Sequence, residues 1–127
     1  MERLFIEKTK ATPFIDFDPD KNVLRIEGQS YPENAFKFYE PVIEWIDKFL
    51  VSARGEILIE IEFHLPYINS SSSKCIMMLL DKLEDAFGRG KNIKVNWYYD
   101  EENESSLECA EEFKEDLTLP FNVIKTV

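Results

Sequence analysis

The sequence of 127 residues has few of the side chains that build metal, redox or disulfide sites. It contains two cysteines, Cys75 and Cys109, and one histidine, His64. Neither cysteine belongs to a CxxC pair, so we expect no disulfide scaffold and favour a reducing compartment. We interpret both cysteines as small hydrophobic residues on the inner faces of helices. A single histidine cannot supply an imidazole pair, and no metal site is expected.

The chain also lacks long apolar runs and an excess of basic residues. No apolar run approaches 18 residues, and the N-terminal segment lacks the apolar core of a signal peptide. The 25 acidic residues outnumber the 15 basic ones and give a net charge of −10. A field of that sign repels phosphate backbones and anionic lipids. We therefore expect a cytoplasmic protein that binds neither nucleic acid nor membranes.

Motifs for catalysis are missing as well. There is no P-loop, no GxGxxG and no GxSxG elbow, so His64 is interpreted as a structural residue at the end of a strand. The acidic run 100–116 lacks the residue order of an EF-hand loop. Glutamates at helical spacing are typical of a solvated helix face, although such a face can also steer a basic partner. We expect a non-enzymatic protein without a cofactor.

The sequence does have enough apolar residues to form the core of one domain. Apolar residues make up 44% of the chain and aromatic residues 13%. A chain of this length and composition buries a core without metals or disulfides. We predict a single domain over residues 1–127.

Hydrophobic periodicity predicts the secondary structure. Period-two alternation and turn residues predict strands, and apolar residues at helical spacing predict helices. The predicted strands are 4–6, 14–17, 23–27, 56–63, 93–99 and 121–127, and the predicted helices are 30–50, 74–87 and 103–117. Ser30 and Glu33 resemble a capping box at the start of the first helix. Pro41 lies inside that helix, so we expect a kink or a break near residues 37–40.

The order of these elements predicts an α/β fold. An N-terminal β-hairpin and a helix are followed by a β-α-β-α-β series, whose crossover connections favour a parallel core. The alternation of the strands indicates that one face of the sheet is more buried than the other. We predict a mixed β-sheet with helices packed mainly on one face.

A run of four serines, Ser70 to Ser73, follows Asn69 at the first strand-to-helix turn of that series. Partner and ligand sites favour the carboxyl ends of parallel strands. N-capping of the helix explains one or two of these residues and stabilises it by about 1 kcal/mol, but it does not explain four hydroxyls. A phosphoryl group would be tolerated at a helix N-terminus and would add roughly −1.5 to −2 charges. Both interpretations remain open from the residues alone.

Three segments of the chain carry a family resemblance. Residues 30–50, 65–86 and 95–121 contain the patterns Y-P-E-N, Y-x-N-[ST]-S-S and W-x-Y-D. In this combination they resemble the SiaC family of bacterial regulatory phosphoproteins, and the resemblance covers nearly the whole chain. It implies a STAS-like fold, similar to that of anti-sigma-factor antagonists.

The resemblance also implies a partner switch. In the family, a cognate Ser/Thr kinase phosphorylates the residue after the asparagine, a PP2C-type phosphatase removes the phosphate, and the unphosphorylated form activates a GGDEF diguanylate cyclase in cyclic-di-GMP signalling. Ser70 matches the phosphorylation site, with Ser71 and Ser72 as possible substitutes. The family site is often threonine, and Pro41 departs from the unbroken first helix that we expect in the family. The surface predicted to bind partners comprises Tyr67, Asn69, Ser70, Ser71 and Lys74.

Two other functions fit the same strand end. One is a switch like that of the anti-sigma-factor antagonists, with a different client. The other is a small-molecule-binding or enzymatic module that uses His64 and Tyr67 as polar groups in a cleft.

Overall fold

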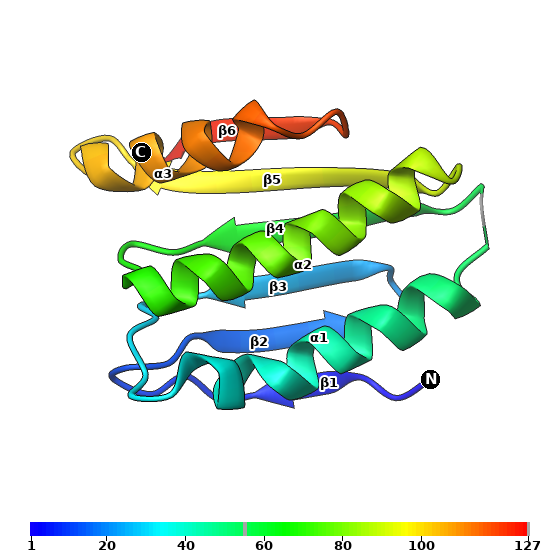
Figure 1. Cartoon of the computed structure of the whole chain (residues 1–127), viewed down its shortest axis with the longest axis horizontal. Coiled ribbons are helices and arrows are strands. Elements are labelled where there is room, and N and C mark those ends of the chain that lie inside the picture. Colours follow the sequence, from blue (N-terminus) through cyan, green and yellow to red (C-terminus); the bar gives the residue numbers. More distant parts are fainter. Residues whose placement is uncertain (55, 127) are drawn as a thin grey trace.

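The computed structural model describes residues 1–54 and 56–126, and within these residues the chain forms six strands and three helices (Figure 1). The strands are β1 (Leu4–Ile6), β2 (Phe14–Asp18), β3 (Val23–Glu27), β4 (Leu58–His64), β5 (Asn92–Asp100) and β6 (Phe121–Thr126). The helices are α1 (Ala35–Ser52), α2 (Ser70–Gly88) and α3 (Glu104–Glu115). No helix of the described residues is both long and apolar enough to cross a membrane. Val127, the predicted end of the last strand, lies outside the described residues.

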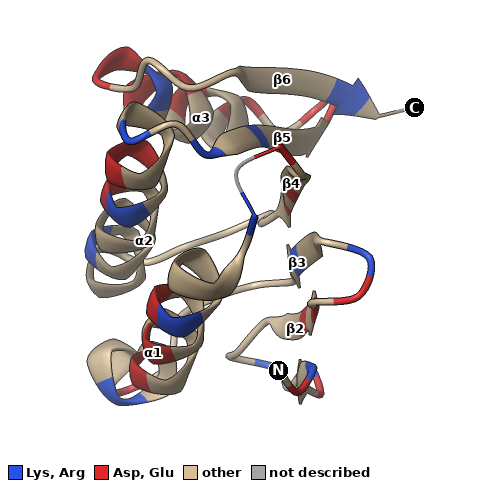
Figure 2. Ribbon diagram, turned by 90° about the vertical axis from the view of Figure 1, so that its right-hand side faces the viewer, with Lys and Arg blue, Asp and Glu red and all other residues tan. Residues whose placement is uncertain are grey.

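The strands form one sheet in which spatial order follows chain order, β1 to β6. The β1–β2 and β2–β3 pairs are antiparallel, whereas β3 to β6 are mutually parallel. All three helices lie on the same side of the sheet (Figure 2). The predicted α/β class, the mixed sheet and the one-sided helix layer are therefore confirmed.

The core lies between the sheet and this helix layer. Every second residue of the central strands points toward the helices, because side chains alternate between the two faces of a strand. The inward residues of β2 to β5 are fully buried: Ile15, Phe17, Leu24, Ile26, Ile59, Ile61, Phe63, Ile93, Val95 and Trp97. Burial of each large apolar side chain stabilises the fold by about 1.5–3 kcal/mol. This layer gives the loops at the strand ends a rigid base.

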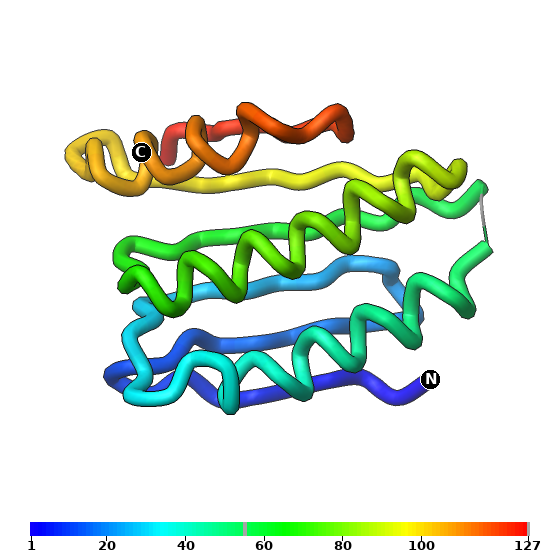
Figure 3. The backbone as a smooth tube through the Cα atoms, in the orientation of Figure 1, coloured from blue at the N-terminus to red at the C-terminus, as the bar shows by residue number. Residues whose placement is uncertain are grey.

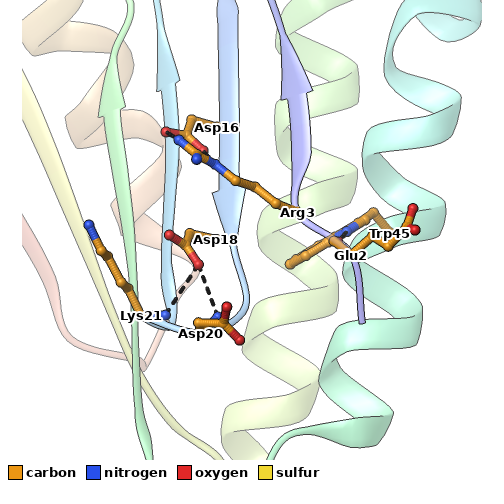
Figure 4. A network of polar contacts seen from close by, with 7 residues as sticks. All are labelled: Glu2, Arg3, Asp16, Asp18, Asp20, Lys21 and Trp45. Atoms are coloured by element: carbon orange, nitrogen blue, oxygen red, sulfur yellow. Dashed lines mark hydrogen bonds and ion pairs between the residues drawn. The ribbon is translucent and has the colours of Figure 1, made fainter.

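Polar contacts fasten the N-terminal strand (Figure 4). Trp45 of α1 donates its indole N–H to the backbone oxygen of Glu2 at 2.8 Å. The Arg3 guanidinium donates to both carboxylate oxygens of Asp16 at 2.6 and 2.7 Å. The hydrogen bond from Arg3 holds the pKa of Asp16 below its usual value. In the β2–β3 turn, Asp18 accepts from the backbone N–H of residues 20 and 21, as the turn chemistry predicts.

Helix α1 is continuous through Pro41, so the predicted break is wrong. Proline lacks the N–H that would bond to the carbonyl of Lys37, and the ring crowds that carbonyl. Pro41 and Lys37 are both exposed, so the missing hydrogen bond lies on the solvent side of the helix, where water can reach the carbonyl. The inward face, which carries the fully buried Tyr39 and Val42, is not affected.

The starts of the helices differ from the sequence prediction. Ser30 does not cap α1, because Asn34 is the N-cap and accepts from the N–H of Lys37 at 3.1 Å. Helix α2 begins at Ser70, four residues before the predicted start. Each of the three described helices has an asparagine N-cap whose side chain accepts from the third helical residue. A favourable cap lets the first turn form on residues of modest helix propensity such as serine.

Candidate functional site

The candidate site lies where β3 and β4 end at the same edge of the sheet (Figure 3). The chain continues from these ends into the loops before α1 and α2. Ser30 donates its N–H to the Tyr67 carbonyl at 2.8 Å, and Asn69 donates its N–H to the Ser30 carbonyl at 3.0 Å. A parallel bridge pairs Ser30 with Ile68. The β3–β4 pairing thus extends beyond the strands and holds both loops in register.

The serine run forms the first turn of α2. Asn69 accepts from the N–H of Ser72 at 2.8 Å through its side chain and from the N–H of Ser73 at 2.9 Å through its carbonyl. Asn69 therefore confirms the capping interpretation, whereas Ser70 to Ser73 are helical residues rather than caps. The first amides of a helix have no partner within it, and those of Ser70 and Ser71, which precede the two amides that bond to Asn69, provide donors for an anion at this turn.

The four hydroxyls lie in different environments. Ser70 and Ser71 are exposed, Ser73 is half-buried, and Ser72 has no exposed surface. This difference follows from the helix period of 3.6 residues, because one residue of the first turn must face the sheet. Four chemically equal residues therefore offer two freely accessible hydroxyls.

The buried hydroxyl of Ser72 belongs to a chain of hydrogen bonds that crosses three elements. Ser30 Oγ donates to Ser72 Oγ at 2.8 Å and lies 2.7 Å from the hydroxyl of Tyr39 on α1. Since Ser30 has a single hydroxyl proton, Tyr39 is the donor to Ser30. Burial raises the pKa of Tyr39 to about 12, and the phenol keeps the proton that this arrangement needs. We call Tyr39, Ser30 and Ser72 the hydroxyl chain.

The residues predicted to bind partners are contiguous. Tyr67 is 53% exposed, and its ring packs edge-on against Tyr31 with 5.9 Å between the ring centroids. Asn69, Ser70 and Ser71 follow directly in the chain. Lys74 is exposed one turn after Ser70, on the same side of the helix. Exposed Met77 and Met78, on the following turn of α2, continue this surface with apolar side chains.

The start of α3 repeats the arrangement of α2. Asn103 caps the helix by accepting from the N–H of Ser106 at 3.0 Å, and Ser106 is buried like Ser72. The Ser106 hydroxyl accepts from the indole N–H of Trp97 at 3.0 Å and donates to the Leu65 carbonyl at 3.3 Å. The Asn103 amide also donates to the Pro66 carbonyl at 2.9 Å. Helix α3 therefore braces the loop that carries Tyr67.

His64 is not part of this arrangement. It follows the inward-facing Phe63, so its side chain points to the sheet face without helices. There its Nδ1 lies 3.9 Å from a carboxylate oxygen of Glu27. Its surroundings form a hollow of only about 80 Å³, also lined by Arg25, Glu62 and Tyr98. The expected cleft formed by His64 and Tyr67 is not supported, because the sheet separates a face residue from the loop surface.

The cysteines show no sign of activation. Burial raises the pKa of the Cys75 thiol, and burial together with nearby Glu112 and Glu108 raises that of Cys109. Both remain protonated thiols near neutral pH, which makes them poor nucleophiles. Among residues 1–54 and 56–126, no three His, Cys, Asp or Glu side chains are grouped to hold a metal ion.

A larger hollow of about 520 Å³ lies between α1 and α2, near their C-terminal ends and away from the serine run. Its lining includes Leu50, Val51 and Ala86. The charged residues around it are engaged in part, since Lys82 pairs with Asp47 at 2.9 Å. None of the serines 70–73, at the other end of α2, lines this hollow.

Sequence reasoning missed three residues of the site. Ser30 is part of the predicted capping box, and neither Tyr39 nor Tyr31 is among the predicted site residues. No local pattern marks them, because the contacts of Ser30 with Tyr39 and Ser72 span 9 and 42 residues. The recurrent Asn-x-x-Ser spacing at 69–72 and 103–106 is the one sequence signal that identifies Ser72 as a buried position.

Comparison with known proteins matches the whole fold. The model of the SiaC family of regulatory phosphoproteins matches residues 6–126. An uncharacterised protein of Pseudomonas aeruginosa (strain UCBPP-PA14) is 41% identical over 123 residues, which cover 97% of this chain and 96% of the relative. SiaC of Pseudomonas aeruginosa superposes with a TM-score of 0.91 at 36% identity, covering 99% of this chain and all of that one. SiaC bound to the diguanylate cyclase SiaD, which it activates, also gives 0.91, at 38% identity over 97% of this chain and 99% of that one.

Proposed function

The chain belongs to the SiaC family of regulatory phosphoproteins, and we propose that it is a non-enzymatic switch controlled by reversible phosphorylation of Ser70. In this proposal the unphosphorylated form binds and activates a GGDEF diguanylate cyclase. A cognate Ser/Thr kinase turns the switch off, and a PP2C-type phosphatase restores it. The observation that carries the proposal is the exposed Ser70 hydroxyl on the first residue of α2, inside a continuous exposed surface.

The first turn of α2 is suited to carry a phosphate. Ser70 is exposed, and the positive end of the helix dipole stabilises negative charge there by about 0.3–1 kcal/mol. Helix α3 supplies a precedent within the same molecule. Its asparagine cap is followed by Glu104, an exposed carboxylate at the position equivalent to Ser70. Phosphorylation of Ser70 therefore leaves the fold intact and changes only the surface.

The docking surface consists of Tyr67, Asn69, Ser70, Ser71 and Lys74, with Met77 and Met78 beside it. In the complex a partner covers the Ser70 hydroxyl, which accepts or donates a neutral hydrogen bond. A phosphate at this atom would lose its hydration on docking, and an unpaired buried charge costs several kcal/mol. Since 1.4 kcal/mol changes affinity tenfold, one phosphate suffices to dissociate a micromolar complex.

The kinase and the phosphatase would bind the same surface as the cyclase, but negative charge there would favour their binding rather than oppose it. The chain carries a net charge of −10, so kinase and phosphatase surfaces rich in Lys and Arg would be attracted to it. Arginine forms bidentate hydrogen bonds with phosphate oxygens and favours the modified form. The same group that repels the cyclase therefore recruits the phosphatase.

Site mapping by mass spectrometry tests the modification directly. Protein isolated from its native host should carry one phosphate in the serine run, on Ser70. A phosphate mapped outside residues 70–73 would contradict the proposed phosphorylation site. The absence of any phosphate under all growth conditions would contradict the proposed phosphorylation switch.

Binding to the diguanylate cyclase encoded in the same genome tests the charge mechanism. Ser70→Ala should bind the cyclase and raise cyclic-di-GMP synthesis like the wild type, whereas Ser70→Asp should lose at least tenfold in affinity. Ser105→Asp is the matched control, because it adds the same charge to an exposed serine in the first turn of α3. Equal binding by Ser70→Ala and Ser70→Asp would contradict the mechanism, and weaker binding by Ser105→Asp than by Ser70→Asp would move the docking surface to α3.

A further inference from the structure

The serine run presents a kinase with four hydroxyl groups in one turn, but only one of them is fully buried. Ser72 has no exposed surface, and its Oγ accepts a hydrogen bond from Ser30 at 2.8 Å. Ser70 and Ser71 are exposed. We propose that Ser30 and Tyr39 are specificity-determining residues that withdraw Ser72 from phosphorylation and leave the exposed hydroxyls as acceptors. This inference rests on the proposed function, because it concerns which atom that reaction modifies.

The chemistry of transfer explains why the hydroxyl chain protects Ser72. A lone pair of the serine oxygen attacks the γ-phosphorus of ATP, the bond to the bridging oxygen breaks, and ADP leaves while the hydroxyl proton passes to a base of the kinase. In Ser72 an oxygen lone pair is engaged by the Ser30 proton, and the atom lies under the helix, out of reach of an in-line phosphate. Modification therefore requires the first turn of α2 to open.

Ser30 holds that turn in place from two directions. Its hydroxyl bonds to Ser72, while its backbone N–H and carbonyl bond to Tyr67 and Asn69. Tyr39 on α1 donates to Ser30 and orients its proton toward Ser72. Ser30 thus acts directly on Ser72, and Tyr39 acts through Ser30. Removal of Ser30 should loosen Ser72 more than removal of the Tyr39 hydroxyl.

A reporter variant isolates the protected hydroxyl. Ser70→Ala, Ser71→Ala and Ser73→Ala together leave Ser72 as the single hydroxyl of the run. This variant is co-expressed with the kinase that phosphorylates the wild-type protein, and phosphates are mapped by mass spectrometry. We expect no phosphate at Ser72 while the hydroxyl chain is intact. The addition of Ser30→Ala should produce Ser72 phosphorylation, and the addition of Tyr39→Phe should produce less.

Ser106→Ala is the matched control. Ser106 is a buried serine at the equivalent position of α3, and its two side-chain hydrogen bonds join it to Trp97 and Leu65 rather than to Ser72. Added to the reporter, it should destabilise the protein without exposing Ser72 to the kinase. Phosphorylation of Ser72 in this control would show that general destabilisation is responsible, which would overturn the roles of Ser30 and Tyr39.

Amide hydrogen exchange gives a second readout that needs no kinase. Loss of one hydrogen bond should raise the exchange of the Ser72 and Ser73 amides about fivefold in Ser30→Ala, with a smaller rise in Tyr39→Phe. Unchanged exchange in Ser30→Ala, Ser72 phosphate with the hydroxyl chain intact, or an unmodified Ser72 in the Ser30→Ala reporter would each overturn the inference. Wild-type protein without any phosphate in the run would instead overturn the proposed function.

Discussion

The same substitution at two serines of one turn should have opposite effects on stability. Ser70→Asp places a carboxylate on an exposed residue at the N-terminus of α2. The helix dipole and the open amides there should stabilise the protein by about 0.3–1 kcal/mol. Ser72→Asp places the same carboxylate at a site without exposed surface, next to the Ser30 hydroxyl. Burial of an unpaired charge should destabilise it by about 3 kcal/mol or more.

The expected difference between the two variants is therefore about 4 kcal/mol in the free energy of unfolding. For a domain of this size, the melting temperature of Ser72→Asp should fall by roughly 10–15 °C, whereas that of Ser70→Asp should not fall. Urea unfolding followed by the fluorescence of Trp45 and Trp97 measures both free energies. These indole rings are buried in the core, and their emission reports global unfolding.

Asparagine variants separate charge from size. Ser70→Asn should match the wild type within about 0.5 kcal/mol, since it is an exposed polar exchange. Ser72→Asn should lose stability through crowding but remain more stable than Ser72→Asp by the cost of the charge. Equal stability of Ser70→Asp and Ser72→Asp would refute the burial difference within the serine run. It would also remove the structural reason for choosing Ser70 over Ser72.

Three further predictions concern Glu84, Pro41 and Tyr39. Burial alone would raise the pKa of Glu84, but the hydrogen bonds that Glu84 accepts from Thr118 and from the N–H of Leu119 outweigh it and hold this pKa below the ordinary value of 4.5. Glu84→Gln should therefore lower the free energy of unfolding by about 1 kcal/mol in urea at pH 7. This difference should vanish as the pH falls through the lowered pKa of Glu84. Pro41→Ala should raise the free energy of unfolding by about 1–3 kcal/mol, because it restores the N–H that α1 lacks on its exposed face. Absorbance titration at 295 nm should show one tyrosine, Tyr39, that ionises only at about pH 12. The Tyr39→Phe variant should lack this last ionisation step. A titration of Tyr39→Phe identical to that of the wild type would contradict the assignment of the step to Tyr39.

The strands of the sheet could be predicted in detail, because the alternation of apolar and polar residues that marks a strand lies within a few neighbouring residues. The alternation of Ile59, Ile61 and Phe63 with polar neighbours records which face each side chain occupies, and the structure confirms it. The turn at 18–22 could likewise be predicted from its own residues, because the Asp18 side chain accepts hydrogen bonds from the backbone two and three residues later. The helix starts were less predictable, because Ser30 with Glu33 has the spacing of a capping box although Asn34 is the residue that caps α1.

The prediction of a break at Pro41 failed for a related reason. The rule against proline in a helix describes the loss of one hydrogen bond and a local clash. Whether that loss breaks the helix depends on the rest of the fold. In α1 the inward residues Tyr39, Val42 and Ile46 are fully buried, and their packing outweighs a defect on the solvent side.

The sequence by itself determined the α/β class, the strand-to-helix turn that carries the serines, and the family to which the chain belongs. The class and the turn follow from residue type and spacing within short windows, whereas the family follows from a resemblance that covers nearly the whole chain. Only the tertiary structure decided which serine is buried, because that depends on how Ser72 meets Ser30 and Tyr39 from two other elements. A hydroxyl has the same chemistry at each of the four positions, and the helix period together with the packing against α1 makes the positions unequal.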